Sequence, residues 1–190
     1  MDSTVLVAIG AYLIGSLSFA VIVSRAFGLA DPRTYGSGNP GATNVLRSGS
    51  RAAAIATLAL DAFKGWLPVM LIKWFGEPYG LGEGAQALAG LAAFVGHLWP
   101  VFFRFAGGKG VATAAGVLLA FEPWLGVAVL ASWLIIAFFF RYSSLASMVA
   151  ALFAPAYYLL ASGVVWQAAP AKVYAMLAMG LLLILRHREN

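Results

Sequence analysis

The sequence predicts an all-α integral membrane protein with about seven transmembrane helices, its amino terminus outside and its carboxyl terminus inside. Hydrophobic residues make up 62% of the 190 residues and charged residues only 10%, with a mean hydropathy of +0.88. A soluble domain carries about 25% charged residues, so this apolar surface is expected to face lipid. The apolar runs are long and do not alternate with polar residues, which favours helices over a β-barrel.

Seven apolar segments follow one another along the chain. They lie near residues 4–24, 52–75, 85–103, 111–121, 124–140, 145–161 and 173–185. A spanning helix needs roughly 20 residues, and segment 111–121 would extend only about 17 Å against an apolar core of about 30 Å. We expect this segment either to be packed inside the bundle or to follow a loop that dips into the membrane. No separate domain is visible, so residues 1–190 are predicted to form one polytopic membrane domain.

The first segment opens after Asp2 with no basic residues before it. A cleaved signal peptide begins with a basic region, so we expect this segment to stay in the membrane as the first spanning helix.

Basic residues are unequally divided between the two sets of connections. One set carries Arg25, Arg33, Arg47, Arg51, Arg104, Lys109, Arg141, Arg186 and Arg188. The other set carries only Lys73 and Lys172. Cytoplasmic loops carry the excess of lysine and arginine, which predicts the orientation given above and an odd number of spans. The basic residues form no stripe, so nucleic acid is not an expected partner, and the absence of cysteine excludes disulfides and cysteine-bound metals.

The first cytoplasmic connection, residues 36–47, reads GSGNPGATNVLR. Its match to G-x-G-x-x-G is weak, because the dinucleotide fingerprint needs a preceding strand. Glycines nevertheless let backbone N–H groups approach an anion, and the arginine adds a planar fork suited to phosphate. The candidate binding residues are Ser37, Gly38, Asn39, Thr43, Asn44 and Arg47. The alternative is a capped turn, with Thr43 or Asn44 starting the next helix.

Asp61 and Lys64 lie three residues apart inside the second apolar segment, on one face of the predicted helix. Ionisable groups in a span cost about 2.5–3.5 kcal/mol each on insertion scales and usually face a partner or a cavity. We expect the two side chains to pair with each other, and a structural role is favoured.

The second cytoplasmic connection, residues 96–113, reads GHLWPVFFRFAGGKGVAT. Gly107, Gly108, Lys109 and Gly110 precede a helix start, where free N–H groups, the helix dipole and an ammonium would bind an anion. It is not a Walker A loop, which requires glycine at position 103 and serine or threonine at position 110. Packing glycines are the alternative, although they do not account for the lysine. Thr113 and His97 belong to the same stretch, and His97 is either a structural residue or a substrate contact.

The remaining polar stretches are Arg141 to Ser147, which reads RYSSLAS, and the terminal RHREN that begins at Arg186. Arginines that flank a span are often simple anchors, and that alternative stands for Arg186. Anchoring does not call for the hydroxyl, imidazole and amide groups. The further candidates are therefore Arg141, Ser143, Ser144, His187 and Asn190.

Together these motifs resemble those of the PlsY family, the bacterial acyl-phosphate:glycerol-3-phosphate acyltransferases, over essentially the whole chain. The resemblance implies acyl transfer from acyl phosphate to the sn-1 hydroxyl of glycerol 3-phosphate, giving lysophosphatidic acid and phosphate. This is the first step of bacterial phospholipid synthesis, on the cytoplasmic side of the cell (inner) membrane. The residues matching the family's motifs, expected to be catalytic, are Ser37, Arg47, Lys109, His187 and Asn190. Family members usually continue beyond this asparagine with a short basic tail.

The expected partners are acyl phosphate, glycerol 3-phosphate and membrane lipid, and the oligomeric state is left open, a monomer included. No cofactor or metal is expected. A membrane phosphotransferase of the CDP-alcohol type is a further alternative, but it would need clustered aspartates for a divalent metal, and only Asp2, Asp31 and Asp61 are present, which form no cluster. An acyl phosphate is already activated, so positioning and charge stabilisation could do most of the catalysis. The alternative function is a membrane transporter of a phosphorylated small molecule. Two glycine-rich stretches superficially suggest its repeats, but both are predicted on the same side.

Overall fold

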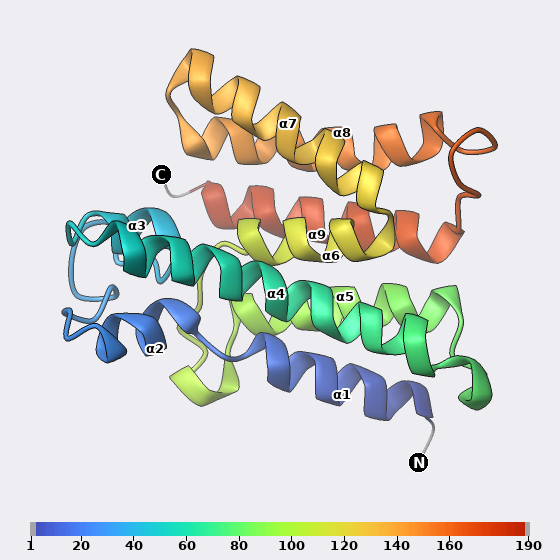
Figure 1. The fold of residues 1–190 in the computed structure, drawn as a ribbon, viewed down its shortest axis with the longest axis horizontal. Helices are drawn as coiled ribbons and strands as arrows, with labels where there is room; N and C mark the ends of the chain where they lie inside the picture. The colour runs from blue at the N-terminus through green and yellow to red at the C-terminus, as the bar shows by residue number, and fades with distance from the viewer. Residues whose placement is uncertain (1–2, 189–190) are drawn as a thin grey trace.

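The computed structural model describes residues 3–188, which form nine α-helices gathered into one bundle (Figure 1). The helices are α1 (Ser3–Gly15), α2 (Phe19–Ala26), α3 (Ala42–Leu46), α4 (Arg51–Phe75), α5 (Glu83–Leu98), α6 (Val111–Phe121), α7 (Pro123–Phe140), α8 (Ser143–Leu160) and α9 (Pro170–His187). Two short 3-10 turns, η1 (Glu77–Tyr79) and η2 (Val101–Phe103), lie in the connections.

The seven predicted apolar segments all form helix, which confirms the all-α membrane class. Six stretches are long and apolar enough to cross a membrane: Ser3–Ala26, Arg51–Phe75, Glu83–Phe103, Pro123–Phe140, Ser143–Leu160 and Pro170–His187. The seventh is α6, with 11 residues. The amino-terminal helix begins at one end of the bundle and α9 finishes at the other (Figure 1).

The short helix α6 is packed inside the bundle, between α4 and α7. Glycines permit its close contact with α4. A Cβ atom added to Gly116 would collide with the carbonyl oxygen of Ala62, and one added to Gly65 would collide with that of Thr113. The first of the two expectations for this segment is therefore confirmed, because neighbouring helices cover it.

The first apolar stretch is not one continuous helix, because α1 and α2 are separated by a break at residues 16–18. The Leu17 carbonyl oxygen at this break accepts a hydrogen bond from Lys64 Nζ at 2.6 Å. Ser16 Oγ accepts a bond of 3.4 Å from the Val101 N–H. Non-helical backbone at membrane depth is tolerated where protein groups satisfy its hydrogen bonds. Lys64 satisfies the Leu17 carbonyl oxygen in this way, and Ser16 satisfies the Val101 N–H.

The loops that carry the sequence motifs gather at the end of the bundle where α2, α3 and the end of α9 lie, which we call the motif end (Figure 1). The opposite end carries other ionic contacts. Lys172 Nζ lies 2.5 Å from Glu83 Oε2 and 3.6 Å from Glu122 Oε1, and Lys73 Nζ donates to the Phe121 carbonyl oxygen at 2.7 Å. The two lysines that the charge count separated from the rest thus tie helix ends together there.

Candidate active site

A cavity of about 990 Å³ lies at the motif end and extends between the helices, and we call it the main cavity. It brings together most of the polar residues that the sequence singled out, from all four motif stretches. These are Ser37, Asn39, Thr43, Asn44, Arg47, His97, Lys109, Gly110, Arg141, Ser143, Ser144 and His187. Four predicted residues do not line it: Gly38, Gly107, Gly108 and Thr113. Asn190 lies outside the described residues.

The main cavity is basic in one part and apolar in another. Four cationic side chains line it: Arg47, Arg51, Lys109 and Arg141. Its apolar lining comes from α4 and from α6 to α9, and includes Leu58, Leu118, Leu130, Trp133, Ala150, Met176 and Met179. One carboxylate, Asp61, is present among the described residues that line it. A molecule with an anionic head and an apolar chain fits this division.

The first loop is held in shape by Asn44, which is buried at the start of the short helix α3. Its Nδ2 donates to the carbonyl oxygens of Pro32 at 2.6 Å and Tyr35 at 3.1 Å. Its Oδ1 accepts from the Ser37 N–H at 3.1 Å. All of these bonds are made to the loop backbone. The residue therefore shapes the loop around the cavity, and Gly41, not Thr43 or Asn44, is the residue that precedes α3.

An ion pair lies just before this loop, outside the membrane spans. Arg33 Nη2 lies 2.6 Å from Asp31 Oδ2. The Arg33 guanidinium, which donates to this carboxylate and attracts it, holds the pKa of Asp31 below its ordinary value. Arg33 also lies over the Phe103 ring, 5.9 Å from its centroid. The first loop and the loop that contains η2 are thus in contact.

The Gly-rich loop, residues 107–110, packs tightly on the end of α5. A Cβ atom on Gly107 would collide with the carbonyl oxygens of His97 and Leu98, and one on Gly108 would collide with the His97 ring. The Gly108 N–H donates to the His97 carbonyl oxygen at 3.1 Å. That N–H group is therefore engaged with the protein and not open to an anion.

The end of the loop is different, because Lys109 and Gly110 both line the main cavity. Gly110 precedes α6 with φ of +87°, a conformation that favours glycine. An anion near Lys109 would thus face an ammonium group and the amino-terminal end of α6.

Arg186, for which simple anchoring was the alternative, braces the Gly-rich loop. Its Nη2 donates to the carbonyl oxygens of Gly107 at 3.1 Å and Gly108 at 3.2 Å. Its guanidinium also lies 6.0 Å from the centroid of the Trp99 ring. The carboxyl-terminal end of α9 is therefore in direct contact with the second motif.

His187 follows immediately and lines the main cavity. Its Nδ1 lies 2.8 Å from the Leu183 carbonyl oxygen. A carbonyl oxygen only accepts hydrogen bonds, so Nδ1 carries the proton, and Nε2 of the neutral ring is left as an acceptor. In the neutral ring, this is the tautomer that a general base acting through Nε2 requires.

Sequence reasoning missed several cavity residues: Arg51, Trp133, Tyr142 and Ser147. Ser147 Oγ accepts from Trp133 Nε1 at 3.0 Å and donates to the Ser143 carbonyl oxygen at 2.7 Å. Arg51 had been counted only for orientation, and Ser147 ends the RYSSLAS stretch, so both could have been found. Nothing in the sequence distinguishes Trp133 from other tryptophans in apolar runs.

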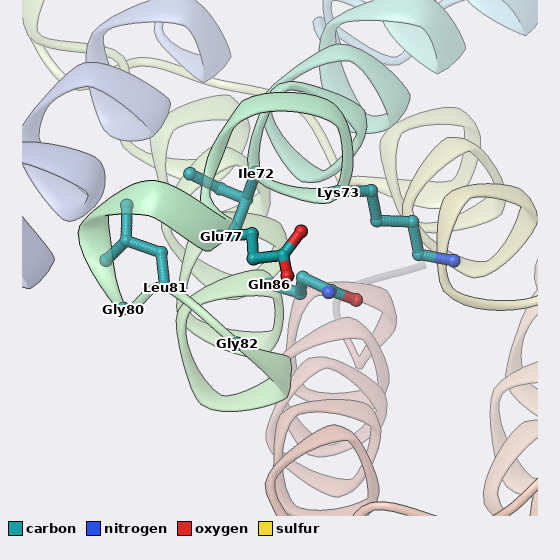
Figure 2. Close-up of a pocket in the computed structure, with 7 residues that line it drawn as sticks. All are labelled: Ile72, Lys73, Glu77, Gly80, Leu81, Gly82 and Gln86. Atoms are coloured by element: carbon teal, nitrogen blue, oxygen red, sulfur yellow. The ribbon is translucent and has the colours of Figure 1, made fainter.

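A second, smaller cavity of about 340 Å³ lies at the opposite end, around the turn between α4 and α5 (Figure 2). It is lined by Ile72, Lys73, Glu77, Gly80, Leu81, Gly82 and Gln86. Figure 2 shows Lys73 extending away from the Glu77 and Gln86 side chains, and its Nζ is bonded to the Phe121 carbonyl oxygen. The smaller cavity contains none of the sequence motifs.

Comparisons with known proteins agree on one family. The profile of the family "Glycerol-3-phosphate acyltransferase" matches residues 5–190. The glycerol-3-phosphate acyltransferase of Albidiferax ferrireducens is 67% identical over 179 residues, which cover 94% of this chain and 80% of that protein. The protein of the same name from Cupriavidus pinatubonensis is 61% identical over 188 residues, which cover 99% of this chain and 91% of that one.

Solved structures give the same result. The chain resembles the crystal structure of PlsY (YgiH), an integral membrane glycerol 3-phosphate acyltransferase, in its glycerol 3-phosphate form. The TM-score is 0.88 at 38% identity, covering 99% of this chain and 90% of the other. The lysophosphatidic acid form of that protein matches with a TM-score of 0.86 at 36% identity, covering 99% and 89%.

Proposed function

This chain belongs to the glycerol-3-phosphate acyltransferase family as a multi-pass membrane enzyme, and we propose that it takes its acyl group from acyl phosphate inside the main cavity. The products would be lysophosphatidic acid and inorganic phosphate. Crystal forms of the related PlsY with glycerol 3-phosphate and with lysophosphatidic acid support the acceptor and the product. The transporter alternative has no comparable support.

The observation that carries the proposal is that one cavity joins a basic end to an apolar interior. Arg47, Arg51, Lys109 and Arg141 line the basic part, and arginine and lysine are the side chains suited to phosphate. Both proposed substrates carry a phosphate, and only the donor carries a long acyl chain. The apolar walls from α4 and from α6 to α9 provide a place for that chain.

The reaction needs little covalent chemistry from the protein. The sn-1 hydroxyl oxygen attacks the carbonyl carbon of the acyl phosphate, a C–O ester bond forms, and the C–O bond to phosphate breaks. An acyl phosphate is a mixed anhydride with a good leaving group, so alignment and charge neutralisation supply most of the rate. Lys109 and Arg47 would neutralise the phosphate that leaves. Ser37, Ser143 or Ser144 would donate hydrogen bonds to the oxyanion or to a phosphate.

The hydroxyl proton needs an acceptor, and His187 offers one. Its Nδ1–H is used by the Leu183 carbonyl oxygen, which leaves Nε2 to take the proton. The departing phosphate is the other group that could accept this proton. The two acceptors differ in whether loss of the imidazole abolishes turnover.

We also propose that the motif end faces the cytoplasm in the bacterial inner membrane. The motif end carries most of the basic residues in the connections, and the opposite end carries Lys73 and Lys172 beside Glu83 and Glu122. Cytoplasmic loops carry the lysine and arginine excess. Glycerol 3-phosphate is charged and water-soluble, so it would reach the site from that side.

The test is phosphate release from palmitoyl phosphate by the full chain reconstituted in lipid, with and without glycerol 3-phosphate. We expect phosphate release that requires glycerol 3-phosphate and an equal amount of lysophosphatidic acid, without added metal or coenzyme A. Turnover with palmitoyl-coenzyme A but none with palmitoyl phosphate would overturn the proposed donor. Folded protein that turns over neither donor would overturn the function.

A further inference from the structure

Three ionisable side chains form a buried cluster at the side of the main cavity. Asp61, Lys64 and His97 are 2%, 1% and 7% exposed. Lys64 Nζ lies 2.8 Å from Asp61 Oδ1, so the pairing expected from their spacing is confirmed. His97 Nδ1 lies 3.7 Å from the same carboxylate oxygen. Asp61 and His97 line the cavity, whereas Lys64 does not.

The cluster connects four parts of the fold. Lys64 and Asp61 lie on α4, and Lys64 Nζ also donates to the Leu17 carbonyl oxygen at the break between α1 and α2. His97 is in the last turn of α5. Its carbonyl oxygen accepts from the Gly108 N–H, and its ring lies so close to Gly108 that a Cβ atom there would collide with it. The cluster therefore reaches the Gly-rich loop that presents Lys109.

Stability alone is a weak reason for such a cluster. A buried ion pair is often no more stabilising than apolar side chains of similar volume, because both charges lose their hydration. Charged groups at membrane depth are costly and usually mark a functional site. Asp61 is also the one acid among the described residues that line the main cavity, where four side chains are cationic. Its negative charge can therefore attract the cationic groups around it.

We propose that the Asp61–Lys64 pair positions His97 and, through His97, the Gly-rich loop that binds a substrate phosphate. This rests on the proposed function, because it assumes that Lys109 faces that phosphate. Lys64, bonded to the Leu17 carbonyl oxygen at the helix break, holds the Asp61 carboxylate in place. The carboxylate in turn sets the orientation of the His97 imidazole. The 3.7 Å separation exceeds hydrogen-bond length, and in the proposed arrangement it shortens to a hydrogen bond when substrate enters. Asp61 and Lys64 are positioning residues, not catalytic ones.

The experiment compares Asp61→Asn with the double variant Asp61→Asn, Lys64→Gln. The single variant leaves a buried lysine without its carboxylate, so its thermal unfolding temperature falls. The double variant removes both charges while keeping an amide donor near Leu17, so its unfolding temperature recovers. The dissociation constants of glycerol 3-phosphate and of a non-reactive alkyl phosphonate are then measured by calorimetry. At least one of them is expected to rise tenfold or more in the double variant.

A purely structural pair would give a different result. If the double variant recovers its unfolding temperature and both dissociation constants stay within twofold of the wild type, the proposal is wrong. Asp61→Glu provides a second arm, because it keeps the charge and moves the carboxylate by one methylene. This variant is expected to fold and to raise the dissociation constant of the same ligand at least fivefold. Unchanged binding in this variant would also refute the proposal.

The route through His97 has its own test, a double-mutant cycle with His97→Gln. Asp61→Asn should weaken binding less than twofold in the His97→Gln background, because the imidazole it positions is already gone. If the two substitutions instead raise the dissociation constant by independent factors that multiply, Asp61 does not act through His97. Lys73→Gln is the matched control, since it changes a half-buried lysine of the same helix outside the main cavity, and it should leave both dissociation constants unchanged.

These measurements are of binding and of unfolding temperature, and none of them needs turnover. Wild-type protein that binds both ligands but transfers no acyl group would refute the proposed function and leave the positioning role standing.

Discussion

Lys109 and His187 come from distant parts of the sequence and meet at the main cavity. Each is presented by a different local structure. Lys109 sits in the Gly-rich loop braced by Arg186, and His187 ends α9 with its Nδ1 bonded to Leu183. At the scale of single residues, we therefore propose separate roles for Lys109 as a cation and for His187 as an imidazole acceptor.

Replacing Lys109 with methionine removes the ammonium while keeping an unbranched side chain. We expect kcat to fall by about 100- to 1,000-fold, the usual cost of removing one group that stabilises transition-state charge. Phosphate release from palmitoyl phosphate measures it. Lys73→Met is the matched control and should keep near-normal turnover, whereas near-normal turnover in Lys109→Met would contradict the role of this lysine.

His187→Asn separates the two nitrogen positions of the ring. The asparagine amide can still donate to the Leu183 carbonyl oxygen, but it offers nothing in place of Nε2. We expect the unfolding temperature to stay close to that of the wild type and kcat to fall by about 100-fold or more, as for loss of a general base. Full activity in this variant and in His187→Gln would show that the departing phosphate accepts the proton instead.

Residue types were a good guide to the cavity, but not to each residue's partners. The sequence placed Asn44 among the donors for an anion, and the structure uses its amide to hold the loop carbonyls of Pro32 and Tyr35. Gly108 likewise offers its N–H to His97. Donor groups can be recognised from sequence, whereas their partners depend on contacts between segments far apart in the chain.

At the scale of helices, α6 shows how an 11-residue segment is kept in a membrane bundle. It packs between α4 and α7, and small residues at the α4 contact bring the backbones together. The sequence indicated that this segment is too short to cross alone. It did not predict the break between α1 and α2, because residues 4–24 are apolar almost throughout and carry no proline.

Gly116→Ala tests the α4–α6 contact. The added Cβ atom would meet the Ala62 carbonyl oxygen, and overpacking of this kind costs about 1–3 kcal/mol. We expect a lower thermal unfolding temperature in detergent. The control is Gly10→Ala on α1, where a Cβ atom meets nothing within 4 Å and the temperature should hold or rise. Equal behaviour of the two variants would argue against the close approach of α6 and α4.

At the scale of the whole molecule, charge and structure divide the bundle in the same way. The motif loops, the main cavity and most basic residues share one end. The smaller cavity lies around the turn between α4 and α5 at the other end (Figure 2). The class, the apolar segments and the gathering of the motifs were predictable, because composition and charge distribution determine them. The apolar lining was not, because it depends on which faces of α6 to α9 turn inward.

Orientation can be tested with single cysteines, since the native chain has none. Ser48 lies in the exposed turn between α3 and α4 at the motif end, and Tyr79 lies in the exposed turn at the opposite end, so each is replaced by cysteine in turn. In intact cells a membrane-impermeant maleimide should label Tyr79→Cys, and it should label Ser48→Cys only after permeabilisation. The reverse pattern would place the main cavity on the outer side.

Photolabelling can show whether one cavity holds both the phosphate and the acyl chain. The probe is a non-reactive alkyl phosphonate with a diazirine near the end of its chain, added to reconstituted protein, and the labelled residues are identified by peptide mass spectrometry. We expect labels on the cavity faces of α7 to α9, at or near Leu130, Trp133 and Met176, and their loss when excess palmitoyl phosphate competes. Labels confined to the smaller cavity, or labelling that palmitoyl phosphate does not displace, would contradict the account.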